Sequence, residues 1–504
     1  MSPSPATTIT RARPRARRVA VLAVAGALAI MAAACGGSSK SGNSGQAATG
    51  DTTAAADLPT CPLDALAQAT QPVEVVLWHA QTAKTKDTLE AQAAKYNASQ
   101  TKVKVRVEAQ GSYEELAKKY QSAIPTKDLP GIALMEDLNI QSLADSGTVL
   151  PAQSCINASG TDMSDFLPTA TAAYTVKGVI FPASANLSTP LIYINRNHFR
   201  RAGLDPDQTP KTLDEIRQYA QKIKDAGVVA KPVALSLQPW FIESWLTGEH
   251  APVVDNDNGR GSGQTTASAF DDDQARQLFT WVQDMYKDGL LDPVPDTGGN
   301  INDFLAMAQQ TASMIIQTST AATSVEAFLG GKLDPSTLQG GSNVGNVDPA
   351  SLDIGAGQLP GVSEPGKVQV GGGAWYIMNT SPPAVQAAAW DFISWWNEVD
   401  QQVTWNLEGS YLPYRISAAQ DARVVDRWTN TLAGRWLAIS YGQLTDGVDP
   451  NYPGPLIGPY DAFRDSVRNG LDNVMFKGTD PAAAVATAAA QTTDAIVRYN
   501  RDNF

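Results

Sequence analysis

The sequence predicts an α/β fold that is built as two lobes. Strand-like apolar runs alternate with amphipathic helix patterns over residues 73–135, and the alternation resumes at residue 191. Alternating strands and helices indicate sheets covered by helices. About 440 residues follow the N-terminal low-complexity segment, more than one core usually holds, so two lobes are expected.

The first lobe is expected to begin with a buried strand, since 73–78 reads Val-Glu-Val-Val-Leu-Trp. Apolar residues at helical or alternating spacing define the elements that follow. They are a helix with Leu89, Ala93 and Tyr96 on one face, a strand in which Val103, Val105 and Val107 alternate with charged residues, a helix that begins at the capping box of Ser112 and Glu115, and a strand over 131–135.

The second half repeats this alternation and then becomes mostly helical. The expected elements are a strand over 191–194, a helix that begins at a capping box of Thr212 and Glu215 with Ile216, Tyr219 and Ile223 inward, a strand over 231–237, a helix with the stripe Ala275, Leu278, Val282 and Met285, and C-terminal helices over 383–396 and 481–499.

Residues 1–34 are typical of a secretory signal peptide. Five arginines precede an apolar stretch over 19–34, which is too short and too rich in alanine for a comfortable membrane span. The stretch ends in Met31-Ala32-Ala33-Ala34-Cys35, which resembles a bacterial lipobox that lacks the usual leucine. We expect lipidation of Cys35, followed by a flexible tether over 35–60 that is rich in Gly, Ser, Ala and Thr. An ordinary signal peptide with an incidental cysteine is the alternative.

The two other cysteines, Cys61 and Cys155, are expected to form a disulfide. Thiols in an exported chain more often pair than stay free, and closing a loop of this size stabilises a fold by roughly 4 kcal/mol in the chain-entropy model. Two separate buried thiols are the alternative.

The charge balance excludes several classes of partner. Without residues 1–34 the chain holds 33 basic and 51 acidic residues, a net charge of −18. Nucleic-acid binders need a basic face, and polybasic attraction to membranes is excluded for the same reason. An anionic ligand would need a local cation.

Enzyme motifs are largely missing from the sequence. The three histidines, His79, His198 and His250, show no zinc-site spacing, and neither a nucleophile elbow nor a phosphate loop occurs. The acidic run over 255–259 fails the frame of a calcium loop. Glu136 and Asp137 are adjacent, so they form a poor pair for glycoside hydrolysis. No metal and no cofactor are therefore expected, although a secreted glycosidase or phosphodiesterase stays open as an alternative.

Several segments, in order, resemble the family 1 extracellular solute-binding proteins of ABC transporters, and within them the branch that binds glycerol 3-phosphate and its diesters. Each segment is weak alone, but together they span nearly the whole mature chain. The segments are Leu77-Trp78-His79-Ala80, Gly111-Ser112-Tyr113-Glu114-Glu115, the run Asn186 to Asn195, Gly371-Gly372-Gly373-Ala374-Trp375, Trp390 to Trp395, and Glu408 to Pro413.

The resemblance implies a periplasmic-binding-protein-like fold, with two α/β lobes, a hinge and a ligand cleft between the lobes. It places lobe 1 at 61–185 with a returning segment at about 313–372, and lobe 2 at 186–312 and 373–504. It also implies that the protein is not an enzyme. We expect a monomer, held at the outer face of the cell membrane by its lipid, that delivers a small molecule to the permease subunits of an ABC importer.

Ligand contacts of the branch carry over to nine positions of this chain. Some of these positions also have a purely structural interpretation. Tyr113 and Tyr411 could be core residues, Ser188 could cap a turn, Arg464 could be a surface residue, and Trp240 could have a structural role. The nine are Tyr113, Glu136, Ser188, Leu237, Trp240, Ser319, Gly372, Tyr411 and Arg464.

Leu237 is the position at which the chain departs from its better-known relatives, which carry a second aromatic there. The smaller side chain leaves room beside Trp240 for a head group. We therefore expect a glycerophosphodiester, with glycerophosphocholine favoured over glycerol 3-phosphate. A di- or oligosaccharide is the alternative ligand.

Overall fold

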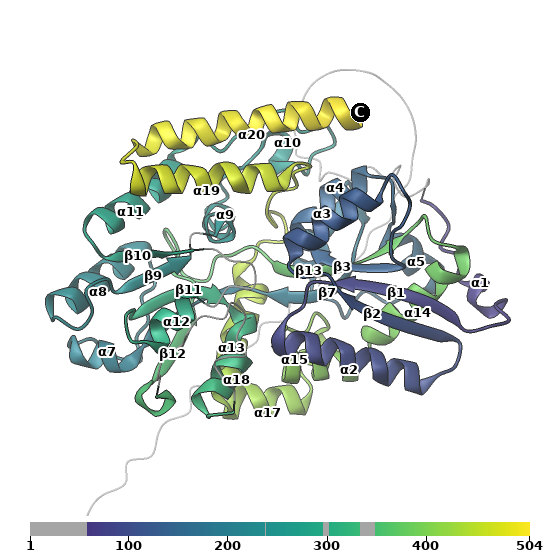
Figure 1. The fold of residues 1–504 in the computed structure, drawn as a ribbon, viewed down its shortest axis with the longest axis horizontal. Coiled ribbons are helices and arrows are strands. Elements are labelled where there is room, and N and C mark those ends of the chain that lie inside the picture. The colour runs from purple at the N-terminus through teal and green to yellow at the C-terminus, as the bar shows by residue number, and fades with distance from the viewer. Residues whose placement is uncertain (1–57, 237, 296–301, 333–347) are drawn as a thin grey trace, which may run out of the picture. The chain divides into compact units, whose positions relative to one another are not determined.

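A computed structural model describes residues 58–236, 238–295, 302–332 and 348–504, and everything below refers to them (Figure 1). The expected signal peptide, Cys35, most of the tether and Leu237 lie outside these ranges. None of the helices in the described part of the chain combines the length and the apolarity that a membrane crossing requires.

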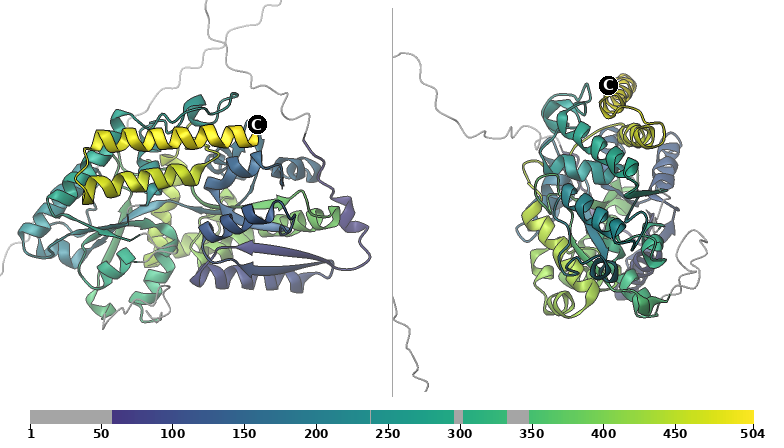
Figure 2. Two further views of the ribbon diagram at one scale, coloured as in Figure 1. Left: turned by 45° about the horizontal axis from the view of Figure 1, so that its top comes forward. Right: turned by 90° about the vertical axis from the view of Figure 1, so that its left-hand side faces the viewer.

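Two sheets organise the fold, and each is covered by helices, as expected for an α/β protein of two lobes (Figures 1 and 2). The first sheet has the order β2-β1-β3-β13-β4, with β7 paired to β13, and we call the part of the chain around it lobe 1. Its strands are β1 (Val73–His79), β2 (Val103–Ala109), β3 (Ile132–Glu136), β4 (Val149–Leu150), β7 (Ala183–Ser188) and β13 (Gly371–Met378).

The second sheet has the order β10-β9-β11-β8-β12, and we call the part around it lobe 2. A separate two-stranded ribbon is formed by β5 (Thr175–Val176) and β6 (Val179–Ile180). The strands of the second sheet are β8 (Pro190–Asn195), β9 (Val233–Ser236), β10 (Leu291–Val294), β11 (Met314–Thr318) and β12 (Ile354–Gln358).

Strand pairing corrects the expected path of the chain between the lobes. β11 and β12 lie inside the segment 313–372 that was expected to return to lobe 1, yet both pair antiparallel with β8 in lobe 2. The chain returns instead with β13, which pairs with β3 and β7 in lobe 1. Neither strand was predicted from the sequence, and the sheet to which a strand adds depends on tertiary contacts that no local pattern records.

Helices of the N-terminal half cover both lobes. The capping box of Ser112 and Glu115 is formed at the start of α3. At α8 only half of the expected box forms: Thr212 accepts from the Glu215 amide, while the Glu215 carboxylate accepts from the Lys211 amide. These helices are α1 (Asp64–Ala67), α2 (Ala83–Ser99), α3 (Tyr113–Ala123), η2 (Asp137–Asn139), α4 (Ile140–Asp145), α5 (Ala152–Ser159), α6 (Pro168–Ala173), α7 (Arg196–Arg201), α8 (Leu213–Asp225), α9 (Pro239–Gly248) and α10 (Asp255–Asn258).

The C-terminal third is mostly helical, as expected. The stripe on α11 is fully buried, and the predicted helix over 383–396 has those bounds. The remaining helices are α11 (Asp273–Lys287), α12 (Asn302–Ala308), η3 (Ser319–Ala321), α13 (Ala322–Leu329), η5 (Pro349–Ser351), α14 (Pro383–Trp396), α15 (Val399–Gly409), α16 (Ile416–Ala419), α17 (Ala422–Asn430), α18 (Leu432–Gly442), the π-helix η6 (Gln443–Gly447), α19 (Tyr460–Phe476) and α20 (Pro481–Asn503).

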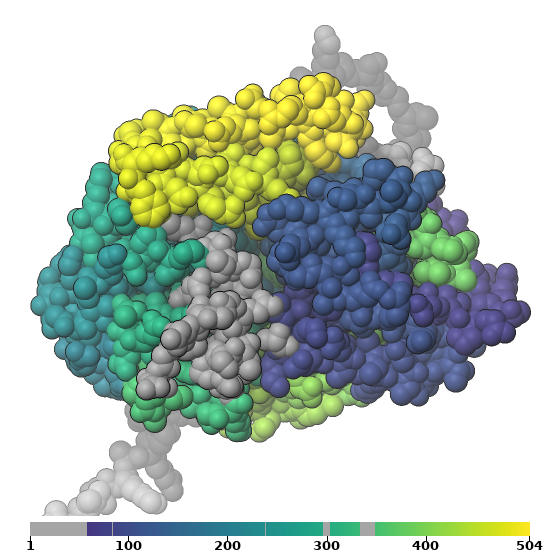
Figure 3. All heavy atoms as spheres, in the orientation of Figure 1, coloured from purple at the N-terminus to yellow at the C-terminus, as the bar shows by residue number. Residues whose placement is uncertain are grey.

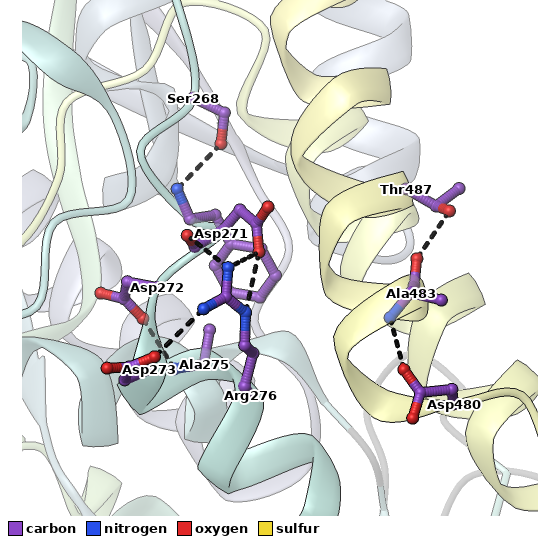
Figure 4. Close-up of polar contacts among 10 residues, drawn as sticks. Ser268, Asp271, Asp272, Asp273, Ala275, Arg276, Asp480, Ala483 and Thr487 are labelled. Atoms are coloured by element: carbon purple, nitrogen blue, oxygen red, sulfur yellow. Dashed lines mark hydrogen bonds and ion pairs between the residues drawn. The ribbon is translucent and has the colours of Figure 1, made fainter.

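Aspartate caps fix the starts of two long helices that pack together, α11 and α20 (Figure 4). Asp272 accepts from the Ala275 amide at the start of α11, and Asp480 accepts from the Ala483 amide at the start of α20. An aspartate side chain at this position satisfies an amide that the helix itself leaves unpaired. Both helices therefore begin at a defined residue.

The helices α19 and α20 run side by side and reach from lobe 2 to lobe 1 (Figures 1 to 3). α19 packs against α9 and α11. Near the C-terminal end of α20, the Tyr499 hydroxyl donates to Asp145 at the end of α4, with an O–O distance of 2.8 Å. The helical pair thus links the lobes and brings α19 to the edge of lobe 1.

The disulfide between Cys61 and Cys155 is present, as predicted, with a Cα–Cα distance of 4.9 Å. It joins the segment just before α1 to α5, and both cysteines are buried. The N-terminal end of the described chain is therefore held to the body of lobe 1.

A single residue, Thr189, separates β7 of lobe 1 from β8 of lobe 2. Its hydroxyl lies 2.7 Å from that of Ser440 and accepts from the Gln443 amide at 2.6 Å. Gln443 also donates to the carbonyl of Pro190. The crossing between the sheets is thus buried and held by α18 and η6.

Candidate ligand-binding site

Three glycines at the start of β13 form the centre of the candidate site. Gly371, Gly372 and Gly373 pair with Ser188, Leu187 and Asn186 of β7, and Gly373 also pairs with Glu136 of β3. Gly372 has φ +135°, and a Cβ there would lie 2.2 Å from the Asn186 carbonyl. Only glycine fits such a conformation and such a close backbone approach.

Two tyrosines meet beside these glycines. A Cβ at Gly373 would lie 3.0 Å from the Tyr113 hydroxyl, and a hydrogen bond with the Tyr411 hydroxyl is among the causes that raise the pKa of Tyr113. Burial raises the pKa of Tyr113 well above its usual value and that of Tyr411 to about 12. Both hydroxyls are therefore neutral hydrogen-bonding groups at physiological pH.

Side-chain amides hold the tyrosine hydroxyls in place. Gln81 donates to the Tyr113 hydroxyl with an N–O distance of 2.7 Å, and Asn186 approaches the same oxygen at 3.5 Å. The side-chain Oδ1 of Asn186 accepts from the Trp405 indole at 3.1 Å, and Tyr411 stacks on that indole with a ring distance of 5.2 Å. Gln81 and Asn186 belong to the site, although sequence reasoning did not select them.

A charged triad lies at the lobe boundary. The guanidinium of Arg464, on α19, donates through Nε and Nη2 to the carboxylate of Glu243 at 2.8 and 2.9 Å, and through Nη1 to Glu136 at 3.0 Å. Glu243 lies on α9, whereas Glu136 ends β3 in lobe 1. Burial opposes the charge of Arg464, but the two carboxylates together raise its pKa well above its usual value.

Glu243 was missed by the sequence reasoning. It is fully buried and lies three residues after Trp240, so both side chains share one helical face. One signal was available: it is the single charged residue in the mostly apolar segment 239–248. Buried acids are rare unless they are paired.

Trp240, the second residue of α9, is partly buried and lies against the glycines. A Cβ at Gly371 would lie 2.3 Å from Cζ2 of its indole. The Trp240 ring also contacts Phe241, with a ring distance of 5.7 Å. The indole is thus covered only in part.

The two serines lie at the crossing between the sheets. Ser188 is 4% exposed and pairs with Gly371. Ser319 is fully buried, and its hydroxyl accepts from the Thr189 amide at 3.4 Å. Ser188 thus borders the glycines, whereas Ser319 joins the group through Thr189.

Seven of the nine expected positions therefore come together around the first residues of β13, and Ser319 adjoins them. Leu237 lies outside the described residues. We call the residues that these contacts link into one group the interlobe cluster: Tyr113, Glu136, Ser188, Trp240, Glu243, Gly371–Gly373, Tyr411 and Arg464.

His79 has a structural part in this arrangement. Its Nδ1 accepts from the Gln81 amide at 3.0 Å, which fixes the turn that directs Gln81 to Tyr113. Burial lowers the pKa of His79 to about 4, so the ring is neutral. Within the described ranges, no group of three or more His, Cys, Asp or Glu is arranged to hold a metal ion.

The chain is similar to known proteins. The sequence profile of the bacterial extracellular solute-binding proteins matches residues 91–431. The chain belongs to this family. The expected resemblance is therefore confirmed.

Relatives of this solute-binding protein include the sn-glycerol-3-phosphate-binding periplasmic protein UgpB of Pectobacterium atrosepticum. The two are 24% identical over 375 residues, which cover 73% of this chain and 78% of the relative. This solute-binding protein is thus UgpB-like in sequence.

Two solved structures share its fold. The GacH receptor of Streptomyces glaucescens, solved unliganded and with acarbose, matches with a TM-score of 0.67 at 19% identity, covering 86% of this chain and 99% of the receptor. UgpB from Mycobacterium tuberculosis in complex with glycerophosphocholine matches with a TM-score of 0.65 at 16% identity, covering 86% and 100%. The two-lobed α/β fold of the family is therefore present in this solute-binding protein.

Proposed function

We propose that this solute-binding protein captures a glycerophosphodiester between its lobes and delivers it to the permease of an ABC importer, with glycerophosphocholine as the leading candidate. The observation that carries the proposal is the interlobe cluster, in which residues from α3, β3, α9, β13 and α19 converge. Such convergence of hydroxyls, an aromatic face and charged groups is typical of a small-molecule site.

Each part of a glycerophosphodiester has a counterpart in the cluster. Glycerol hydroxyls need acceptors, and the Glu136 carboxylate can accept from them. Phosphate oxygens accept from guanidinium, hydroxyl and backbone amide donors, which Arg464, the tyrosines and the glycines supply. A quaternary ammonium suits the face of Trp240, a contact worth about 0.5–2 kcal/mol.

The charge of the triad favours a diester over glycerol 3-phosphate. Arg464 brings one positive charge, whereas Glu136 and Glu243 bring two negative charges. A phosphate monoester carries about −1.5 to −2 at neutral pH, and this charge would be poorly balanced beside a single shared arginine. Glycerophosphocholine has one phosphate charge and a compensating cation, so it suits an acidic surrounding better.

A di- or oligosaccharide is the second candidate. The observation that favours it is the same triad, because a guanidinium shared by two carboxylates behaves as a hydrogen-bond donor more than as a free cation. Tyrosine hydroxyls, a carboxylate and the Trp240 face would suit sugar hydroxyls and a sugar ring equally well.

Calorimetry separates these ligands. We expect wild-type protein to bind glycerophosphocholine more tightly than glycerol 3-phosphate, maltose or trehalose. Arg464→Ala should abolish diester binding, because the phosphate loses its proposed cation, and Leu237→Trp should shift preference toward glycerol 3-phosphate by filling the space beside Trp240. Tight binding of maltose or trehalose with no response to glycerophosphocholine would select the sugar candidate instead.

The protein is further proposed to catalyse no reaction. Asp137 follows Glu136 directly, and Glu136 is already engaged by Arg464, so the pair offers no free acid and base. Incubation with glycerophosphocholine and with p-nitrophenyl glycosides should leave both intact. Release of choline or nitrophenol by pure protein, but not by Arg464→Ala protein, would contradict this.

We also propose that a lipid on Cys35 anchors the monomeric protein to the outer face of the cell membrane. Cys35→Ala should release the mature protein into the medium, whereas the wild type stays with the membrane fraction. Mass spectrometry of the N-terminal peptide should detect acyl chains on Cys35. An unmodified thiol on membrane-bound wild-type protein would refute the anchor.

A further inference from the structure

The Glu243 carboxylate has four hydrogen-bond donors and no access to solvent. Nε and Nη2 of Arg464 donate to its two oxygens, and the Tyr460 hydroxyl and the Gln369 amide donate to Oε2, both at 3.1 Å. These donors come from α19 and from the segment between β12 and β13. An unpaired buried carboxylate would strongly destabilise the fold. The four donors therefore compensate for the burial of the Glu243 charge.

The two carboxylates that share Arg464 differ in their surroundings. The Glu243 side chain is 0% exposed and forms a two-point contact, whereas the Glu136 side chain is 30% exposed and forms one hydrogen bond. A two-point contact fixes the plane of a guanidinium as well as its position. The orientation of Arg464 is thus set by Glu243, and Nη1 is left to point at Glu136 in lobe 1.

We propose that Glu243 is a positioning residue for ligand binding. It holds the Arg464 guanidinium so that Nη1 faces the interlobe cluster, while Glu136 is the partner that a ligand oxygen replaces or joins. The role of Glu136 rests on the proposed function, because it requires a ligand between the lobes. The orientation of Arg464 by Glu243 concerns the protein alone and can be tested without a ligand.

The ligand-free test is NMR of arginine side chains. In wild-type protein the Arg464 Nε–H should give a resolved, slowly exchanging signal, because it is buried and donates to Glu243. Glu243→Gln should shift this signal and speed its exchange, since the amide replaces one of the two acceptor oxygens with an –NH2 group that donates instead of accepting. Glu136→Gln, and the control Glu408→Gln on the exposed side of α15, should leave it in place.

The ligand-dependent test is a double-mutant cycle. We expect Glu243→Gln to weaken binding of glycerophosphocholine roughly 10- to 100-fold, as for other residues that orient a ligand-contacting group. Arg464→Met should weaken it at least as much, and the double variant should be no worse than Arg464→Met alone. A merely structural role of Glu243 would instead give additive losses. Glu408→Gln should bind as the wild type does.

The outcomes separate the two claims. If wild-type protein binds none of glycerophosphocholine, glycerol 3-phosphate, maltose and trehalose, the proposed function fails, while the NMR result still decides the positioning. Additive losses, or an Nε–H signal unchanged by Glu243→Gln, would overturn the positioning proposal. If Glu243→Gln does not fold, Glu243→Asp takes its place, because it keeps the charge but withdraws the carboxylate, and it should show the same non-additivity.

Discussion

The indole of Trp240 rests directly on the backbone of Gly371, so closely that a Cβ at residue 371 would lie 2.3 Å from Cζ2. The aromatic face proposed for the ligand is therefore positioned by the absence of a side chain on β13. Helix α9 of one lobe and strand β13 of the other meet at this contact.

Gly371→Ala should displace Trp240 and weaken ligand binding at least tenfold. The indole is only partly buried and can rotate away, so the loss of stability should be modest, about 1–2 kcal/mol. Calorimetry and urea unfolding measure the two effects. Gly442→Ala on α18 is the control: a Cβ there meets nothing within 4 Å, so affinity should not change, and stability should rise by at most about 1 kcal/mol because alanine is the better helix former. Unchanged affinity in Gly371→Ala would contradict the stacking role.

Asp137→Asn should stabilise the protein at pH 7. Burial and the charge of Glu136 raise the pKa of Asp137 well above its usual value, so the folded state holds this proton more tightly than the unfolded state. The wild type loses that stability as the pH rises through the folded pKa. The variant should therefore be more stable than the wild type at pH 7, and the gain should vanish near pH 4, where the unfolded carboxyl also holds its proton. A stability difference between the variant and the wild type that grows on acidification would contradict the raised pKa of Asp137.

His79→Asn should reduce the acid sensitivity of the protein, because the pKa of His79 is lowered to about 4 by burial. The unfolded chain takes up this proton near pH 6.5, before the folded state does, so wild-type stability falls between pH 6.5 and pH 4. Over this range the wild type should lose about 3 kcal/mol more than the variant. Urea unfolding at pH 7 and pH 4.5 gives the comparison, and parallel losses in both proteins would refute it.

Removal of the disulfide by the double change Cys61→Ser and Cys155→Ser should cost about 4 kcal/mol of stability, since 94 residues separate the two cysteines. Reduction of the wild type should reproduce the loss, and reduction should not affect the variant. Thiol titration of unfolded, unreduced mature protein should detect neither residue. Two titratable thiols would contradict the bond.

Local features of the fold could be predicted because short-range chemistry determines them. The buried stripe of α11, the capping box of Ser112 and Glu115 and the helix at 383–396 all follow from residues a few positions apart. The sheet to which β11 and β12 add could not be predicted from local sequence. These strands pair with the two edges of β8. Such pairing joins segments more than one hundred residues apart.

The candidate site was predictable only in part. Tyr113, Gly372 and Tyr411 lie in segments that carry the family resemblance, so their positions could be transferred. Glu243 lies outside these segments, and its partner Arg464 is 221 residues away. A buried ion pair leaves no local trace in the sequence beyond one acid in an apolar helix.

The single-residue crossing at Thr189 bears on how selectivity can change. A rotation of one sheet relative to the other would change the backbone torsions next to Thr189, and it would strain or exchange the hydrogen bonds of Thr189 with Ser440 and Gln443. If the lobes rotate on binding, part of the binding free energy of every ligand offsets the cost of changing these contacts. Substitutions at 440 and 443 would raise or lower the affinity for all ligands together, whereas substitutions in the interlobe cluster would alter their ranking. The overall affinity and the preference among ligands can therefore evolve separately.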